Sequence, residues 1–330
     1  MSRLEHVREE LDELLPQSSW VKNQAIAVLL PCYNEEAAIT RVIEDFRKVL
    51  PSAQIYVYDN NSTDGTREAA SKAGAIVRSE SYQGKGNVVR RMLADIDADI
   101  YVLADGDATY DTSAAGRLID ALVTDNLDMV VGTRSGGGSG AYRRGHQWGN
   151  RFFNRVVGHL FGAGFTDILS GYRVLSRRFA KSFPVTSSGF EIETELSVHA
   201  LDLKIATAEV ELPYAARPQG SESKLRTWRD GTRILWTIAM LYKELKPGRF
   251  FGAMGAALML TSLGLGLPLV ATFLETGLVP RFPTAILAAA IMQLGFLSAG
   301  CGLVLESVAQ GRREAKRMRY LDLRSVAVKA

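Results

Sequence analysis

Short apolar runs alternate with amphipathic stretches through residues 24–212 of the chain. Each run is typical of a buried strand, and the stretches between the runs have the apolar spacing of helices. The expected strands cover residues 25–30, 55–58, 75–78, 100–103, 129–131 and 206–212. Strands that alternate with helices predict an α/β fold with a doubly wound, mostly parallel sheet.

Two much longer apolar stretches, residues 250–274 and 282–305, contain no charged residue. About 20 apolar residues span a bilayer, so each stretch is long enough to cross one. A buried helical hairpin is the alternative, and two such lengths in succession disfavour it. Basic residues flank the pair on both sides, whereas the connection between them holds only Arg281. The positive-inside rule therefore predicts that both ends, and the domain before them, are cytoplasmic.

Two amphipathic stretches flank the predicted α/β domain. Residues 3–15 place apolar side chains at helical spacing among charged ones, which predicts an N-terminal helix. Residues 228–245 have the same pattern directly before the apolar stretches, and predict a helix along a membrane surface. Residues 142–155 mix arginines with aromatic residues. They fit either an ordinary amphipathic helix or a surface that meets lipid phosphates.

Composition adds little to this pattern. Hydrophobic residues make up 47% of the 330 residues, enough for a sizeable core, and the net charge of +3 is too small to indicate a nucleic-acid partner. The two cysteines, Cys32 and Cys301, predict no disulfide framework. The first 20 residues are charged and lack the apolar core of a secretory signal.

The candidate chemistry lies in polar clusters that follow the predicted strands. Asp105 and Asp107 come just after the strand at 100–103, and alternating residues face the same side of a strand. Two close carboxylates repel each other unless a cation lies between them, and oxygen ligands suit Mg²⁺ or Mn²⁺. For such a pair alone, a polar turn is the alternative. Further clusters at 31–36 and 59–66 also follow strands, so all are expected at one edge of the sheet, where ligands bind.

Seven motifs, taken in order, resemble family 2 glycosyltransferases of the polyprenyl-phosphate type. This family includes dolichol-phosphate mannose synthase and bacterial polyprenyl-phosphate glucosyltransferases. The resemblance covers about residues 24–245, and the two apolar stretches resemble the membrane hairpin of the bacterial members. The motifs are Pro31–Glu35, Asp59–Thr66, Gly84–Gly86, Asp105–Asp107, Gly132–Arg134, Asp167–Arg173 and Gly220–Lys224.

The resemblance implies a GT-A fold, a nucleotide-sugar donor and specific residue roles. The implied nucleotide-sugar-binding residues are Pro31, Tyr33, Glu35, Asp59, Lys85, Asp105 and Gly106. The implied metal ligands for Mg²⁺ or Mn²⁺ are Asp105 and Asp107, and the implied catalytic residues are Asp167 and Asp107. The residues implied to bind donor or acceptor phosphates are Arg134, Arg143, Arg217 and Lys224. The dolichol-phosphate enzymes commonly have a glutamine ligand where this chain has Thr109, which leaves a third side-chain ligand open.

The implied reaction is inverting, metal-dependent transfer of a sugar to a polyprenyl phosphate, as in cell-envelope glycan synthesis. The implied location is the inner (plasma) membrane, with a cytoplasmic catalytic domain, and a homo-oligomer is expected. An acceptor phosphate is largely dianionic at neutral pH, so Asp167 need not act as a strong base. The expected divisions are an N-terminal helix (1–23), the GT-A domain (24–226), an interfacial helix (227–249), a transmembrane hairpin (250–305) and a basic cytoplasmic tail (306–330).

Two alternatives stay open. The first is a glycosyltransferase with another lipid or a polysaccharide as acceptor. Processive synthases usually have more spans and a Gln-x-x-Arg-Trp motif, which Gln147-Trp148 does not match. The second is a membrane-anchored protein that binds a nucleotide-sugar without turnover, and the intact carboxylates argue against it. The sequence does not name the sugar, and it leans toward UDP over GDP only through the bacterial-like hairpin.

Overall fold

The computed structural model describes residues 24–135, 144–162, 164–213 and 227–326, which form two compact units. The first unit comprises Met1–Leu235 together with Arg317–Ala330, and the second comprises Trp236–Lys316. The predicted N-terminal helix at residues 3–15 lies outside the described residues.

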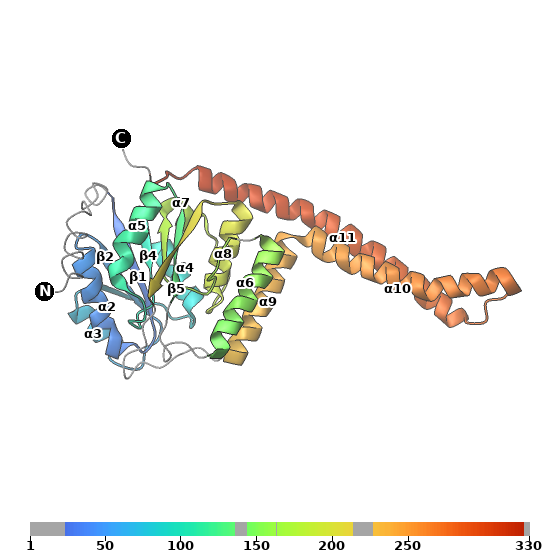
Figure 1. Ribbon diagram of the computed structural model, residues 1–330, viewed down its shortest axis with the longest axis horizontal. Helices are drawn as coiled ribbons and strands as arrows, with labels where there is room; N and C mark the ends of the chain where they lie inside the picture. Colours follow the sequence, from blue (N-terminus) through green and yellow to red (C-terminus); the bar gives the residue numbers. More distant parts are fainter. Residues whose placement is uncertain (1–23, 136–143, 163, 214–226, 327–330) are drawn as a thin grey trace, which may run out of the picture. The chain divides into compact units, whose positions relative to one another are not determined.

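The first unit is built on a seven-stranded sheet with the strand order β3-β2-β1-β4-β6-β5-β7 (Figure 1). All neighbouring strands pair in parallel except β6, which runs antiparallel to both β4 and β5. The mostly parallel α/β sheet is therefore confirmed. The strands are β1 Ile26–Cys32, β2 Gln54–Asp59, β3 Ile76–Ser79, β4 Ile100–Leu103, β5 Met129–Ser135, β6 Arg173–Ser176 and β7 Thr207–Pro213.

Helices cover both faces of the sheet because neighbouring strand residues point to opposite sides. Val28 and Leu30 of β1 belong to the core beneath α2, α3 and α5, whereas Leu29 belongs to the core beneath α4, α7 and α8. The helices of these two layers are α2 Glu36–Val49, α3 Thr66–Lys72, α4 Lys85–Asp95, α5 Ala115–Thr124, α7 Arg177–Ser182 and α8 Ile192–Leu203. The unit also contains the short 3₁₀ helix η2, Thr112–Ala114, and α6, Arg144–Phe161. Helix α9 spans Thr227–Leu245, as the amphipathic pattern predicts.

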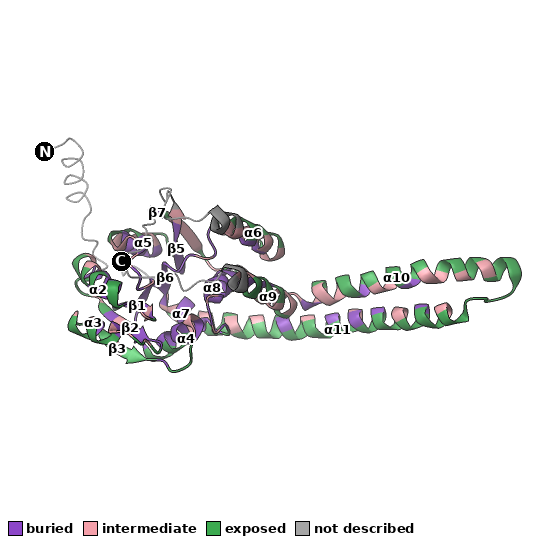
Figure 2. Cartoon of the chain, turned by 90° about the horizontal axis from the view of Figure 1, so that it is seen from below, coloured by how far each residue is buried: buried purple, intermediate pink, exposed green. Residues whose placement is uncertain are grey.

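The second unit contains the two longest helices, α10 (Pro247–Thr276) and α11 (Phe282–Leu321). Among the described residues, these two are long and apolar enough to cross a membrane. Figure 2 shows exposed residues along both helices, and the buried positions on α11 are small. Small residues let two membrane helices approach closely. Hydroxyl groups add hydrogen bonds across the pair, because Ser262 donates to the Ala288 carbonyl at 2.6 Å and Ser298 donates to the Phe251 carbonyl at 2.9 Å.

Gly255 lies at the tightest contact between α10 and α11. A Cβ added there would lie 2.8 Å from the Gly295 carbonyl oxygen, whereas one added at Gly264 would meet nothing within 4 Å. We expect Gly255→Leu to force the helices apart and to destabilise the hairpin by about 1–3 kcal/mol, the usual cost of overpacking. Thermal unfolding in detergent measures the effect, with Gly264→Leu as the matched control. Equal melting temperatures for the two variants would contradict the predicted contact.

Helix α11 continues well past Leu305, where the predicted membrane span ends, and stops at Leu321. The residues after Lys316 belong to the first unit. The Tyr320 hydroxyl donates a hydrogen bond to Asp128 at 2.6 Å, and Val326 is buried in the core beneath α2 and α5. Arg178 pairs with the same Asp128 carboxylate and lies over the Tyr320 ring, 4.8 Å from its centre. Much of the predicted tail is thus helical, and its end packs against the sheet domain.

Candidate active site

The carboxyl ends of three neighbouring parallel strands meet at one edge of the sheet. Strands β1 and β2 end at Cys32 and Asp59, which are paired in register, and Asp105 follows β4 on the other side of β1. A Cβ added at Gly106 would lie 2.6 Å from the Cys32 sulfur, so the loop after β4 packs directly against the end of β1. The predicted convergence of the polar clusters at one edge is confirmed.

Asp59 places an unsatisfied acceptor at this edge. Its side chain is buried, its Oδ2 accepts a hydrogen bond from the Ser62 backbone at 3.3 Å, and its Oδ1 has no partner. A buried acceptor without a donor lowers the stability of the fold, and an N–H group of a ligand would supply the missing hydrogen bond. The neighbouring Asn60 ties the strand end to the loop before α4, because its Oδ1 accepts from the Gly84 backbone at 2.7 Å. Asp59 is therefore held in place with one oxygen free for a ligand.

The other residues implied in nucleotide binding lie beside this edge. Pro31 is half-buried within β1, and Tyr33 is exposed. Glu35 is buried, and its backbone N–H donates to the Thr66 hydroxyl at 2.8 Å. The Glu35 carbonyl accepts from Ala38 at 3.0 Å, which starts α2. This loop therefore connects the ends of β1 and β2.

Lys85, at the start of α4, is buried between two carboxylates. Its ammonium group pairs with Asp105 and lies 2.5 Å from a carboxylate oxygen of Glu193 on α8. Burial by itself would lower the pKa of Lys85, but the two carboxylates outweigh burial and raise that pKa above its ordinary value. The lysine is therefore a fixed cation that holds the Asp105 side chain in one position. The sequence analysis did not identify Glu193 as a site residue.

Asp107 is buried and held by Thr109, the residue at the position where a third side-chain metal ligand was left open. Its Oδ1 accepts from the Thr109 backbone at 3.2 Å and from the Thr109 hydroxyl at 2.6 Å. Ala108, between them, has a positive φ of 57°, a left-handed conformation that residues with a side chain seldom adopt. The Thr109 hydroxyl thus orients the Asp107 carboxylate. The described residues contain no group of three or more His, Cys, Asp or Glu side chains arranged for a metal.

Two carboxylates still fit a divalent cation. Mg²⁺ in particular is usually bound through one or two carboxylates, with substrate phosphates and water completing the shell. The donor set here is oxygen only, both carboxylates are anchored by neighbours, and the pair lies at the ligand-binding edge of the sheet. These residues are therefore suited to hold Mg²⁺ or Mn²⁺ together with a diphosphate.

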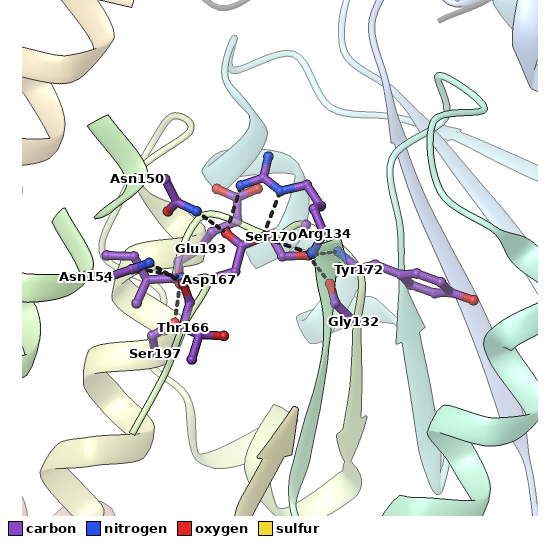
Figure 3. A network of polar contacts seen from close by, with 12 residues as sticks. Gly132, Arg134, Asn150, Asn154, Thr166, Asp167, Ser170, Tyr172, Glu193 and Ser197 are labelled. Atoms are coloured by element: carbon purple, nitrogen blue, oxygen red, sulfur yellow. Dashed lines mark hydrogen bonds and ion pairs between the residues drawn. The ribbon is translucent and has the colours of Figure 1, made fainter. Parts of the chain in front are cut away.

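Asp167 forms a second polar network with Arg134 and Asn150 (Figure 3). The Arg134 guanidinium donates to both carboxylate oxygens, at 2.8 and 2.7 Å, and the Asn150 amide donates to one of them at 3.1 Å. Burial by itself would raise the pKa of Asp167, but these donors outweigh burial and hold that pKa below its ordinary value. The Arg134 backbone N–H also donates to this carboxylate, at 3.2 Å. A carboxylate with four donors and a low pKa is poorly suited to remove a proton.

The buried Arg173 shapes the loop that carries Asp167. Its guanidinium donates to the carbonyls of Ile168 and Ser170, both at 2.9 Å, and to the Ser197 hydroxyl at 3.0 Å. Burial lowers the pKa of Arg173 to about 10, so the side chain stays charged at neutral pH. The Ser170 hydroxyl in turn donates to the Gly132 carbonyl at 2.5 Å and ties the loop to β5 (Figure 3). Arg173 therefore sets the backbone path between Asp167 and Gly171.

The Arg134–Asp167 pair has a predictable pH dependence. A carboxyl group whose pKa is lower in the folded protein stabilises the fold above its unfolded value of about 3.9 and loses that contribution as the pH falls through the folded pKa. We expect Asp167→Asn to be less stable than the parent protein by a constant amount between pH 5 and 7, and the deficit to shrink below about pH 4. Thermal unfolding across this pH range measures it. A deficit that persists unchanged at pH 3 would contradict the ion pair, and the half-buried Asp111→Asn is the control.

Three of the residues implied to bind phosphate, Arg143, Arg217 and Lys224, lie outside the described residues. Of that group, Arg134 is described, at the edge where the carboxylates gather. The fold and this arrangement together define an α/β protein whose candidate site lies at the carboxyl ends of parallel strands, where open α/β sheets bind their ligands.

Comparison with known proteins identifies the family. The profile described as Glycosyl transferase family 2 matches residues 27–183. Glycosyltransferase AglJ of Haloferax volcanii is 40% identical over 245 residues, which cover 74% of this chain and 80% of that protein. A dolichyl-phosphate hexose transferase of the same organism is 31% identical over 219 residues, which cover 66% of this chain and 94% of that protein. The chain belongs to glycosyltransferase family 2 and is a glycosyltransferase.

Solved structures agree with the fold. Glucosyl-3-phosphoglycerate synthase from Mycobacterium tuberculosis, in complex with Mn²⁺, UDP-glucose and phosphoglyceric acid, superimposes with a TM-score of 0.57 at 25% identity. The match covers 68% of this chain and 81% of that structure. The GT-A fold that the sequence predicts is confirmed.

Proposed function

We propose that this glycosyltransferase moves a sugar, with inversion, from a UDP- or GDP-sugar to a polyprenyl phosphate at the cytoplasmic face of the inner membrane. The observation that carries the proposal is the presence, in one chain, of an anchored carboxylate pair at the GT-A edge and two helices of membrane-crossing length. The dolichyl-phosphate hexose transferase relative supports a polyprenyl phosphate acceptor. The structure solved with UDP-glucose and Mn²⁺ supports a nucleotide-sugar donor and a divalent metal.

On this proposal the donor binds across the edge formed by β1, β2 and β4. Asp59 would accept a hydrogen bond from the nucleoside through its free oxygen, next to Pro31, Tyr33 and Glu35. Asp105 and Asp107 would hold Mg²⁺ or Mn²⁺, which neutralises the charge that develops on the diphosphate leaving group. Lys85 would keep Asp105 in place, and Gly106 would let the loop pack against Cys32.

The acceptor phosphate would need orientation more than deprotonation. Its second pKa is about 6, so an oxygen is already a nucleophile at neutral pH. That oxygen would attack the anomeric carbon as the bond from that carbon to the diphosphate breaks, which inverts the configuration. Arg134, Arg143, Arg217 and Lys224 would hold the phosphates of the two substrates. Asp167 would act by orienting Arg134, in agreement with its lowered pKa.

The remaining parts of the chain would bring the lipid to this edge. The hairpin at 250–305 would cross the membrane twice, and the helix at 227–249 would lie along the cytoplasmic surface. The catalytic domain at 24–226 and the basic segment at 306–330 would both be cytoplasmic, and the protein would work as a homo-oligomer. No nucleic-acid partner is proposed, since the net charge of +3 gives no basis for one.

A transfer assay tests the proposal directly. Purified full-length protein in detergent, with Mg²⁺ or Mn²⁺, is given a short polyprenyl phosphate and a panel of UDP- and GDP-sugars, and lipid-linked product is separated by thin-layer chromatography. We expect one donor to give a metal-dependent glycolipid. Donor hydrolysis without lipid product would mean that the acceptor is wrong. Donor binding without turnover for every sugar would overturn the enzymatic reading of this site.

A further inference from the structure

Gln293 carries an unsatisfied amide at the middle of an apolar helix. It lies eleven residues after Phe282 and twelve before Leu305, the ends of the uncharged stretch of α11. At 1.5 Å per residue, both ends are about 16–18 Å away along the helix. Long lysine and arginine side chains reach the membrane surface only from near the ends of a helix, so the shorter glutamine cannot reach water from this depth.

The amide faces away from the partner helix of the hairpin. Gly295, two residues later, is buried against α10, and two residues correspond to a rotation of about 200°. Gln293 is exposed, and its side chain has no hydrogen bond to its own helix or to α10. It therefore points toward the lipid.

Several hydroxyl groups along the two helices have hydrogen-bond partners within the hairpin. Thr261 and Thr272 donate to carbonyls of their own helix at 2.9 Å, and Ser262 and Ser298 donate across the hairpin. Among the described residues, the Gln293 amide is the polar side chain at this depth that has no partner. An unsatisfied polar group costs several kcal/mol in lipid, so an intramembrane glutamine indicates a further helix.

We propose that Gln293 pairs with Gln293 of a second copy of this chain, across a two-fold interface formed by this face of α11. A carboxamide is both donor and acceptor, so two copies related by a two-fold axis satisfy each other without any additional residue. Gly300 lies two turns later on the same face, and a Cβ added there would meet nothing within 4 Å. Its lack of a side chain leaves room for the second helix to approach. The inference rests on the proposed membrane hairpin and is independent of the sugar and of the acceptor.

Energy transfer in vesicles tests the pairing without measuring activity. Full-length protein labelled at its N-terminus with either a donor or an acceptor fluorophore is reconstituted together in phosphatidylcholine and phosphatidylglycerol vesicles, and the lipid-to-protein ratio is varied. We expect Gln293→Leu to raise the dissociation constant in lipid about three- to thirty-fold, the range that interhelical hydrogen bonds provide. Gln293→Asn keeps an amide and is expected to lie between Gln293→Leu and the parent protein.

Thr261→Val is the matched control, because it removes an exposed hydroxyl that is bonded within its own helix. It is expected to leave the dissociation constant unchanged. Vesicle flotation separates the possible failures. Protein that does not float with the vesicles would overturn both the membrane hairpin and this interface. Protein that floats but gives the same dilution curve for Gln293→Leu and the parent would overturn the interface alone.

Discussion

Replacing Asp107 with alanine is expected to lower kcat/KM for glycosyl transfer by at least about 10³-fold, with the fold intact. A bound metal contributes several kcal/mol by stabilising charge that develops on the leaving group, and each 1.36 kcal/mol corresponds to a factor of ten. Asp107 is one of two carboxylates suited to hold that metal, and the Thr109 hydroxyl fixes its orientation at 2.6 Å.

Initial transfer rates at donor concentrations below KM measure this effect, and isothermal titration with UDP at increasing Mn²⁺ separates binding from chemistry. Asp111→Ala is the matched control, since Asp111 lies on the same loop but caps the η2 helix through the Ser113 backbone at 3.0 Å. A loss of less than tenfold in Asp107→Ala would show that the pair does not hold a catalytic metal. An equal loss in Asp111→Ala would indicate general disruption of the loop.

Replacing Lys85 with alanine is expected to destabilise the sheet domain by about 3–5 kcal/mol. The substitution leaves Asp105 and Glu193 facing each other with no cation between them, and the Glu193 side chain is only 6% exposed. Removing one partner of a buried ion pair lowers the free energy of unfolding by far more than the intact pair contributes to it, because the remaining charge stays buried. The same change frees Asp105 to move, so transfer activity is also expected to fall.

Thermal unfolding of Lys85→Ala from pH 5 to 8 tests the cause of the loss. Two uncompensated carboxylates have raised pKa values in the folded protein, so the variant should regain stability as the pH falls and they become protonated. The double variant Lys85→Met with Glu193→Gln removes the repulsion and should recover part of the loss at pH 8. Lys48→Ala, which breaks an exposed pair with Asp45, should have no measurable effect. A pH-independent loss in Lys85→Ala would contradict the electrostatic explanation.

Strands with continuous apolar runs are the most readily predicted from the sequence. Strands β1 and β4 are buried on both faces, so nearly every residue in them is apolar and the pattern is unmistakable. Strand β6 was missed because only Val174 and Leu175 of its four residues are apolar, and its ends are a buried arginine and a buried serine. Its antiparallel direction also breaks the βα alternation on which the prediction relied.

The site was predictable where chemistry follows a strand directly and less so where it depends on packing. Asp59, Asp105 and Asp107 were identified by their positions after strands, and their gathering at one edge follows from the parallel sheet. Glu193 stands between two other glutamates, and the three have different partners. Glu195 accepts from the Ser187 backbone at 2.8 Å and Glu191 from the Gly189 backbone at 3.1 Å, whereas Glu193 reaches Lys85. No spacing rule distinguishes them, because their orientation depends on how α8 docks.

The role of Arg173 also could not be predicted from the sequence pattern. A motif arginine beside a candidate catalytic aspartate suggests a phosphate ligand, yet its side chain is fully buried and supports the loop backbone. Asn150 is a third example, since it donates to Asp167 from α6, 17 residues away in the chain. Contacts of this kind arise from tertiary packing, which a linear pattern does not contain.

The return of the chain to the sheet domain after α11 affects how the protein is made. The sheet domain up to Leu235 is synthesised before the hairpin, whereas Tyr320 and Val326 are synthesised only after it. Until then Asp128 and Arg178 lack the tyrosine, and the core beneath α2 and α5 lacks a valine. Final closure of the catalytic domain therefore comes after both apolar helices have been synthesised. A chain cut before α10 to obtain a soluble enzyme would lose these contacts, whereas one in which a linker replaces the hairpin would keep them.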